Sequence, residues 1–155
     1  MLVPLRTQGF HDISIRMTGS FNDGGNPTLK VKVWGVLANN AVEIEVVLDT
    51  GFSGFLTLPL QTALPLGLIL LSTAEYVLAD NSRQLNLLCQ GSIGFDDENV
   101  SGLIAISPGD PLLGMEFLRK SELHLSLDAT NSIFVLEKKT PKETTITSHT
   151  DGSLG

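Results

Sequence analysis

The sequence has one cysteine, Cys89, so an internal disulfide framework is excluded. No second cysteine and no histidine at zinc-site spacing accompanies it, which favours the interpretation of a small buried apolar residue. The three histidines, His11, His124 and His149, stand far apart along the chain. The sequence therefore predicts neither a metal site nor a cofactor.

Positive charge is also scarce. Ten lysines and arginines face seventeen aspartates and glutamates, a net charge of −7, and the basic residues form no cluster. A nucleic-acid-binding protein or one that binds anionic membranes needs a basic patch, so these two partners are excluded. The acidic stretch Asp96-Asp97-Glu98 lacks the further ligands of a calcium loop and is interpreted as a solvated turn.

The sequence lacks a long uninterrupted apolar run. Its most apolar stretch, Leu56 to Leu71, is broken by Pro59 and Pro65, and it is shorter than the roughly 20 residues that a spanning helix needs. The first ten residues do not have the basic and then apolar pattern of a secretory signal. We therefore expect no membrane span, and a cytoplasmic location.

What the sequence does contain is a β-rich pattern. Apolar residues make up 42% of the 155 residues and charged residues 17%, a composition typical of one globular domain with a core. Apolar and polar residues alternate over 29–37 and 42–48, which predicts a hairpin. Further strands are expected at 73–79, 83–95, 100–106, 123–127 and 133–136, and short helices at 59–67 and Met115–Lys120. The pattern predicts an all-β barrel or sandwich with at most two short helices.

One acidic residue, Asp49, stands at a position where burying its charge would cost free energy. The second arm of the first hairpin becomes fully apolar just before Asp49, so the carboxylate follows a buried strand directly. The residues after it offer compensation. Thr50 and Ser53 carry hydroxyls, and Gly51 allows the backbone to approach closely.

Two motifs carry a family resemblance. Leu48-Asp49-Thr50-Gly51-Phe52-Ser53 resembles the catalytic signature of retropepsin-like (retroviral-type) aspartic proteases, with the bacterial single-domain members closest. Further along, Leu112-Leu113-Gly114 and the predicted helix after it resemble the second conserved element of the same family. The order and spacing of the two motifs agree. The resemblance implies an all-β retropepsin-like acid protease barrel with one or two short helices.

The resemblance also divides the chain. It implies a protease domain over residues 28–137, with an N-terminal extension at 1–27 and a loose C-terminal tail at 138–155. Between the motifs, the hairpin around Ala79, Asp80, Asn81 and Ser82 is similar to the flap that covers the substrate in this family. The stretch from Ala79 to Asn86 contains no glycine, unlike viral flap tips. The sequence therefore does not decide whether this hairpin closes over a substrate as the flap of the family does.

The implied reaction is peptide-bond hydrolysis by two carboxylates that share a proton. Asp49 begins the only Asp-Thr-Gly or Asp-Ser-Gly in the chain, so a homodimer is needed to bring two copies of Asp49 together. In the family, the residue equivalent to Thr50 links the two active-site loops across the dimer axis, and the residue equivalent to Ser53 hydrogen-bonds the carboxylate. The expected partners are a peptide or protein substrate and a second copy of the chain.

Two alternatives remain. A dimeric binding module could keep the protease fold with weak or lost catalysis, which the intact Asp-Thr-Gly opposes and the glycine-free hairpin favours. A purely structural β-domain would use Asp49 only as a turn residue. That interpretation does not explain Gly114.

Overall fold

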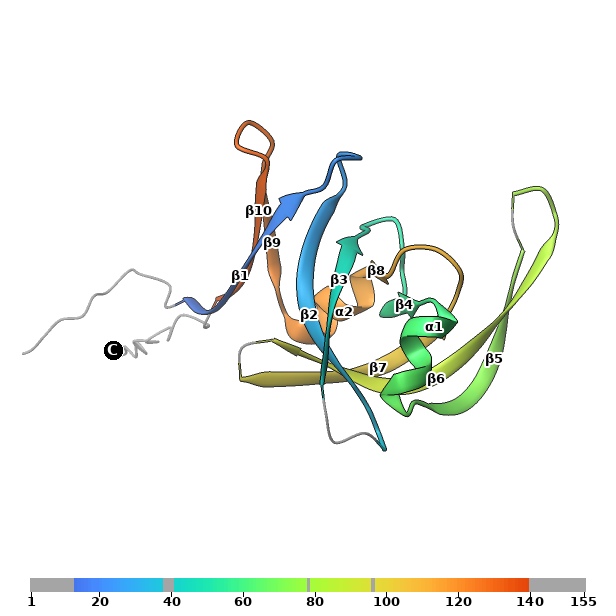
Figure 1. The fold of residues 1–155 in the computed structure, drawn as a ribbon. Helices are drawn as coiled ribbons and strands as arrows, with labels where there is room; N and C mark the ends of the chain where they lie inside the picture. The colour runs from blue at the N-terminus through green and yellow to red at the C-terminus, as the bar shows by residue number, and fades with distance from the viewer. Residues whose placement is uncertain (1–12, 38–40, 78, 96, 140–155) are drawn as a thin grey trace, which may run out of the picture.

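The computed structural model describes residues 13–37, 41–77, 79–95 and 97–139. Its strands form one ten-stranded sheet in the order β5-β6-β7-β4-β8-β3-β2-β1-β10-β9, with an additional pairing of β6 and β2 (Figure 1). That additional pairing closes the strands from β6 round to β2 into a barrel. The expected all-β acid protease barrel with short helices is confirmed.

Six strands form the closed barrel. They are β2 (Pro27–Gly35), β3 (Val42–Leu48), β4 (Leu56–Leu58), β6 (Arg83–Phe95), β7 (Glu98–Ile106) and β8 (Leu112–Leu113). The hairpin predicted from alternation is the antiparallel β2–β3 pair. Its inward residues Val31, Val33 and Val46 are almost fully buried, while the lysines and glutamates between them face solvent.

The remaining elements extend this barrel. Three strands, β1 (Ile13–Phe21), β10 (Ile133–Lys139) and β9 (His124–Asp128), continue the sheet on one side, and β5 (Ile69–Val77) pairs with β6 on the other. Two short helices, α1 (Leu60–Ala63) and α2 (Met115–Ser121), lie between strands, and a 3-10 turn (Leu64–Leu66) follows α1. Both predicted helices are present. Pro65 and Gly67 limit the first, because Gly67 takes a left-handed conformation with φ of 64°.

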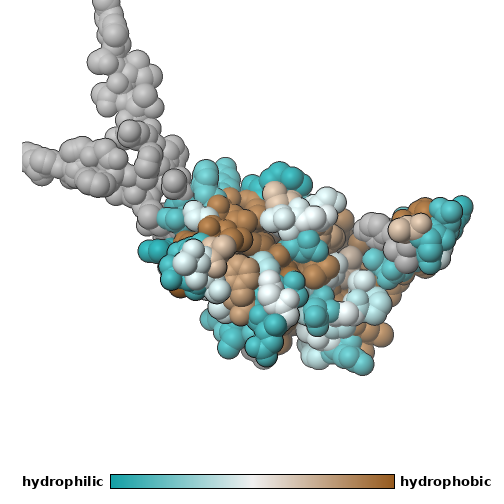
Figure 2. Space-filling model, turned by 90° about the horizontal axis from the view of Figure 1, so that it is seen from above, coloured by the Kyte–Doolittle hydropathy of each residue, from teal (hydrophilic) through white to brown (hydrophobic). Residues whose placement is uncertain are grey.

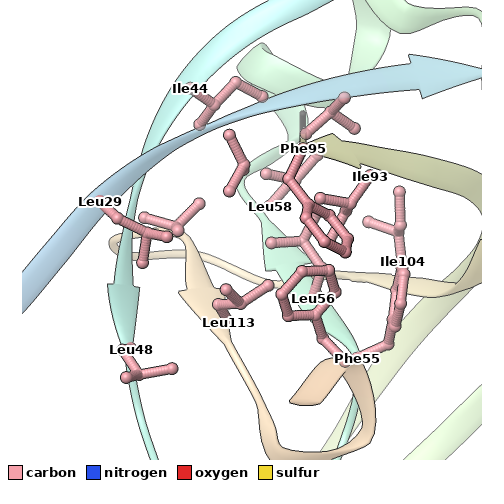
Figure 3. Close-up of a cluster of buried hydrophobic side chains, with 14 of the residues drawn as sticks. Leu29, Ile44, Leu48, Phe55, Leu56, Leu58, Ile93, Phe95, Ile104 and Leu113 are labelled. Carbon is pink, nitrogen blue, oxygen red and sulfur yellow. The ribbon is translucent and has the colours of Figure 1, made fainter. Parts of the chain in front are cut away.

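The core lies inside the barrel and beneath α2. Phe117 is fully buried and makes edge-to-face contacts with Phe55 and Phe95, at centroid distances of 5.9 and 5.4 Å. Leu48 and Leu113 belong to the same cluster (Figure 3). Cys89 is 7% exposed, as expected for a buried small residue, and this burial raises the pKa of its thiol.

The N-terminal boundary differs from the prediction. Strand β1 lies inside the stretch 1–27 that was assigned to an extension, yet it pairs with β10 and, at its end, with β2. The folded unit therefore begins before residue 28. Residues 1–12 and most of the predicted C-terminal tail, 140–155, lie outside the described residues.

Candidate active site

The carboxylate of interest, Asp49, stands at the end of β3, where three strands meet. The two-residue strand β8 lies between β3 and β4, parallel to the first and antiparallel to the second. Backbone hydrogen bonds hold Asp49 on both sides: its N–H donates to Leu113 O at 2.9 Å, and its carbonyl accepts from Phe52 N at 3.1 Å. A local turn and a distant strand, β8, thus position one residue.

The Asp49 side chain is partly exposed. Its Oδ1 accepts a hydrogen bond from the Gly51 N–H at 2.9 Å, which turns the carboxylate towards the following loop. Thr50 and Ser53 are both exposed. Within the described chain, Ser53 makes no hydrogen bond to Asp49, so its expected role remains a prediction.

The loop after Asp49 is tied to the start of α2. Gly114 N–H donates to Phe55 O at 3.0 Å, Met115 N–H to Phe52 O at 2.8 Å, and Glu116 N–H to Gly54 O at 3.1 Å. These are the amides at the beginning of a helix, which have no partner within the helix itself. The second motif therefore lies directly against the first, and the structure brings together Asp49 and the predicted Leu112, Leu113 and Gly114.

Phe52 packs over two glycines, Gly54 and Gly114. A Cβ on Gly54 would be 2.5 Å from the Phe52 ring, and a Cβ on Gly114 would meet the same ring and overlap the Gly54 carbonyl oxygen. A side chain at either glycine would displace the aromatic ring or the backbone. Phe52 therefore packs against the loop that follows Asp49, a role that the sequence alone did not reveal.

Thr57 in β4 was also missed by sequence reasoning. Its residue is 9% exposed, and its Oγ1 accepts a hydrogen bond from the Leu112 N–H at 3.0 Å. The hydroxyl thus supplies an acceptor to β8 in place of a backbone carbonyl. A threonine inside an apolar strand, Leu56-Thr57-Leu58, was the available signal.

We expect Thr57→Val to lower the free energy of unfolding by about 1–3 kcal/mol, because the partly buried Leu112 N–H would lose its acceptor while the side-chain volume stays nearly constant. Urea unfolding followed by circular dichroism measures this. The matched control is Thr73→Val on the exposed part of β5, expected to stay within about 0.5 kcal/mol. Equal effects at the two positions would contradict the assigned role of Thr57.

The predicted flap is a projecting hairpin formed by β5 and β6. From Arg83 to Asn86, β6 pairs with β5 alone, so this part of the hairpin stands clear of the barrel (Figure 1). At its tip, Asp80 Oδ1 accepts hydrogen bonds from the Ser82 N–H at 2.9 Å and from the Ser82 hydroxyl at 2.5 Å. Asn81 takes a left-handed conformation, with φ of 66°. Asn81 in this Asp-Asn-Ser turn therefore takes the left-handed conformation that glycine usually provides in tight turns. Ala79, next to the turn, is exposed.

These bonds depend on the charge of Asp80. The Ser82 side chain and backbone lower the pKa of Asp80 below its ordinary value of 3.8. Because the pKa of Asp80 is lower in the folded state, the charged carboxylate stabilises the turn at pH values above the unfolded-state pKa. This stabilisation is lost as the pH falls through the folded-state pKa. The tip is thus expected to keep its turn at mildly acidic pH.

We expect Asp80→Ala to accelerate amide hydrogen exchange at Ser82, measured at neutral pH by mass spectrometry, because the amide loses its acceptor. In the wild type, protection at Ser82 should fall only at pH below 3.8. Asp23→Ala in the β1–β2 turn is the control, since no hydrogen bond from a described residue to that carboxylate is present. Unchanged exchange at Ser82 in the Asp80 variant would contradict this account of the tip.

The part of the chain that the structure describes also bears on metal binding and membrane spanning. No group of three or more histidine, cysteine, aspartate or glutamate side chains gathers there as a metal site would require. Among the same residues, no helix has the length and apolar character for crossing a bilayer.

The chain has the fold of a retropepsin-like aspartic protease. It is similar to the crystal structure of a retropepsin-like aspartic protease from Rickettsia conorii, with a TM-score of 0.55 and 18% sequence identity, over 88% of this chain and 100% of that one. No protein-family model matches the sequence, and no curated protein matches it significantly.

Proposed function

We propose that the protein is a homodimeric aspartic endopeptidase in which two Asp49 carboxylates, one from each chain, activate a water molecule. The observation that carries the proposal is the position of Asp49. It follows a buried strand, its backbone is held by β8, and its carboxylate is partly exposed next to Gly51. A structural turn aspartate would not require the Gly114 contact that holds this loop.

The proposed reaction uses the two carboxylates in different protonation states. The ionised carboxylate accepts a proton from water as the water oxygen attacks the peptide carbonyl carbon, and the neutral one donates its proton to the carbonyl oxygen. Collapse of the tetrahedral intermediate breaks the C–N bond, and a proton goes to the leaving amine. Two carboxylates so close cannot both ionise, and activity is therefore expected at acidic or mildly acidic pH. This chemistry needs no metal or organic cofactor.

Residues next to Asp49 and the hairpin tip also have roles in the proposed active site. Thr50 links the two active-site loops across the dimer axis, Gly51 orients the Asp49 carboxylate through its N–H, and Ser53 hydrogen-bonds a carboxylate once the dimer forms. The hairpin tip, Asp80 to Ser82, covers a bound peptide and excludes water. Its projection from the barrel supports this role.

Cleavage of a random peptide library from pH 3 to 8 tests the proposal, with and without an active-site-directed aspartic protease inhibitor such as pepstatin. We expect cleavage that is strongest below neutral pH and is reduced by the inhibitor. An absence of cleavage by a preparation verified as dimeric would overturn the proposal in favour of a protease-fold binding module.

A further inference from the structure

The strand pairings place one face of the projecting hairpin on the same side of the sheet as Asp49. Residues paired between neighbouring strands lie on the same face of a sheet, and so do residues two positions apart in one strand. Followed through β6, β7, β4, β8 and β3, these pairings connect Asn86 on the hairpin with Asp49. The connecting residues are Leu88, Ala105, Thr57, Leu112 and Val47. We call the side of the hairpin that carries Asn86 its Asp49 face.

The Asp49 face of the hairpin is polar where the hairpin stands clear of the barrel. There, β6 contributes two amide side chains to this face, Gln84 and Asn86, because they alternate with residues of the opposite face. The residue of β5 that pairs with Asn86 is Ala74, whose side chain is small. This part of the hairpin therefore presents amides towards the side on which Asp49 lies.

The opposite face of the hairpin is apolar and charged. Leu85 and Leu87 are exposed there, and Arg83 forms an ion pair of 3.3 Å with Glu75. Figure 2 shows the end of the hairpin standing out from the rest of the molecule, with hydrophilic and hydrophobic surface together. A hairpin that covered only apolar side chains of a substrate would have its leucines on the Asp49 face. The observed arrangement indicates polar contacts on that face instead.

Asn86 has a hydrogen-bonding group that the chain does not use. The residue is 8% exposed, and its side-chain oxygen Oδ1 is buried without a hydrogen bond from any residue that the structure describes. Buried polar groups normally have a partner, and an unpaired carbonyl oxygen costs free energy. A leucine side chain of similar size would fill this position without that cost. Asn86 therefore offers a free acceptor on the face that leads to Asp49.

We propose that Asn86 is a specificity-determining residue, whose Oδ1 accepts a hydrogen bond from an N–H or O–H group of a substrate side chain. The hairpin lifts to admit the peptide, which exposes the Asn86 amide, and then closes over it. A neutral or basic polar side chain can donate this bond, whereas an ionised carboxylate and an apolar side chain have no such hydrogen. The inference rests on the proposed function, because it needs a peptide bound between the hairpin and Asp49.

Three peptides that differ at one position test this role. Glutamine, methionine or glutamate is placed in turn at each position flanking the cleaved bond of the best library peptide, and kcat/KM is measured at pH 6. Glutamine and methionine have similar lengths, and glutamate is ionised at this pH because its ordinary pKa is about 4.3. At one position, we expect the wild type to prefer glutamine over both others at least about tenfold, since only glutamine donates a hydrogen bond. In Asn86→Leu, the preference for glutamine over methionine should disappear or reverse.

Leu85→Asn is the matched control, because it makes the reverse exchange at an exposed position on the opposite face of the hairpin. We expect it to keep the wild-type preference, and circular dichroism verifies that both variants fold. A wild type without a preference for glutamine, or an Asn86→Leu protein that keeps this preference, would overturn the role of Asn86 and leave the proposed protease intact. A wild type that cleaves no peptide would overturn both.

Discussion

Asp49→Asn is expected to lower the rate of peptide cleavage at least about a hundredfold, while the protein keeps its fold and the proposed dimer. An asparagine amide neither accepts a proton from water at this site nor shares one with a partner carboxylate. Its side-chain oxygen still accepts the hydrogen bond from the Gly51 N–H, so the loop loses little. The loss of activity is measured as the rate at which the best library peptide is cleaved. Thermal unfolding shows whether the variant keeps its fold.

The matched control for this substitution is Asp97→Asn at an exposed position between β6 and β7. It removes the same charge from a chain with net charge −7. We expect it to leave the rate unchanged within the error. Cleavage by the Asp49 variant at more than a tenth of the wild-type rate would contradict the assignment of Asp49 as the catalytic carboxylate.

Gly114→Ala is expected to have the second-largest effect, on both stability and activity. The added methyl carbon would overlap the Gly54 carbonyl oxygen and stand 2.8 Å from the Phe52 carbonyl oxygen. Both are backbone atoms of the loop that follows Asp49, so the loop must shift. Overpacking of this kind costs about 1–3 kcal/mol, and a displacement of about 1 Å at an active site can cost a hundredfold in rate.

Urea unfolding and peptide cleavage measure these two effects. Gly24→Ala is the control, because a Cβ there meets only side-chain atoms at 3.4 Å. We expect the control to change the unfolding free energy by less than about 1 kcal/mol. A Gly114 variant with the wild-type stability and rate would show that contact between the two motifs does not position Asp49.

Much of the fold was predictable because its signals are local. Alternation over 29–37 and 42–48 gave the β2–β3 hairpin, and Asp80-Asn81-Ser82 marked the turn between β5 and β6. Strand β1 was not recognised, because the resemblance covered the chain only from residue 28 onward and left residues 1–27 as an extension. Its place in the sheet depends on β10, more than a hundred residues further along the chain.

In the candidate active site too, features carried by neighbouring residues were predictable, and contacts between distant segments were not. An aspartate after an apolar strand was visible in the sequence, and so was the second motif with Gly114. The position of β8 between β3 and β4 was not, since two residues give no periodicity and both pairings are long-range. For the same reason, the packing of Phe52 over Gly54 and Gly114 could be seen only in three dimensions.

In the proposed enzyme, each active site contains Asp49 from two chains. Mixing wild type with Asp49→Asn protein, under conditions where subunits exchange, tests it most directly. At equal amounts, random pairing places half of the wild-type chains in inactive mixed dimers, so activity per wild-type chain should fall to about a half, and further with excess variant. Activity per wild-type chain that stays constant at every ratio, with exchange verified, would contradict a shared active site.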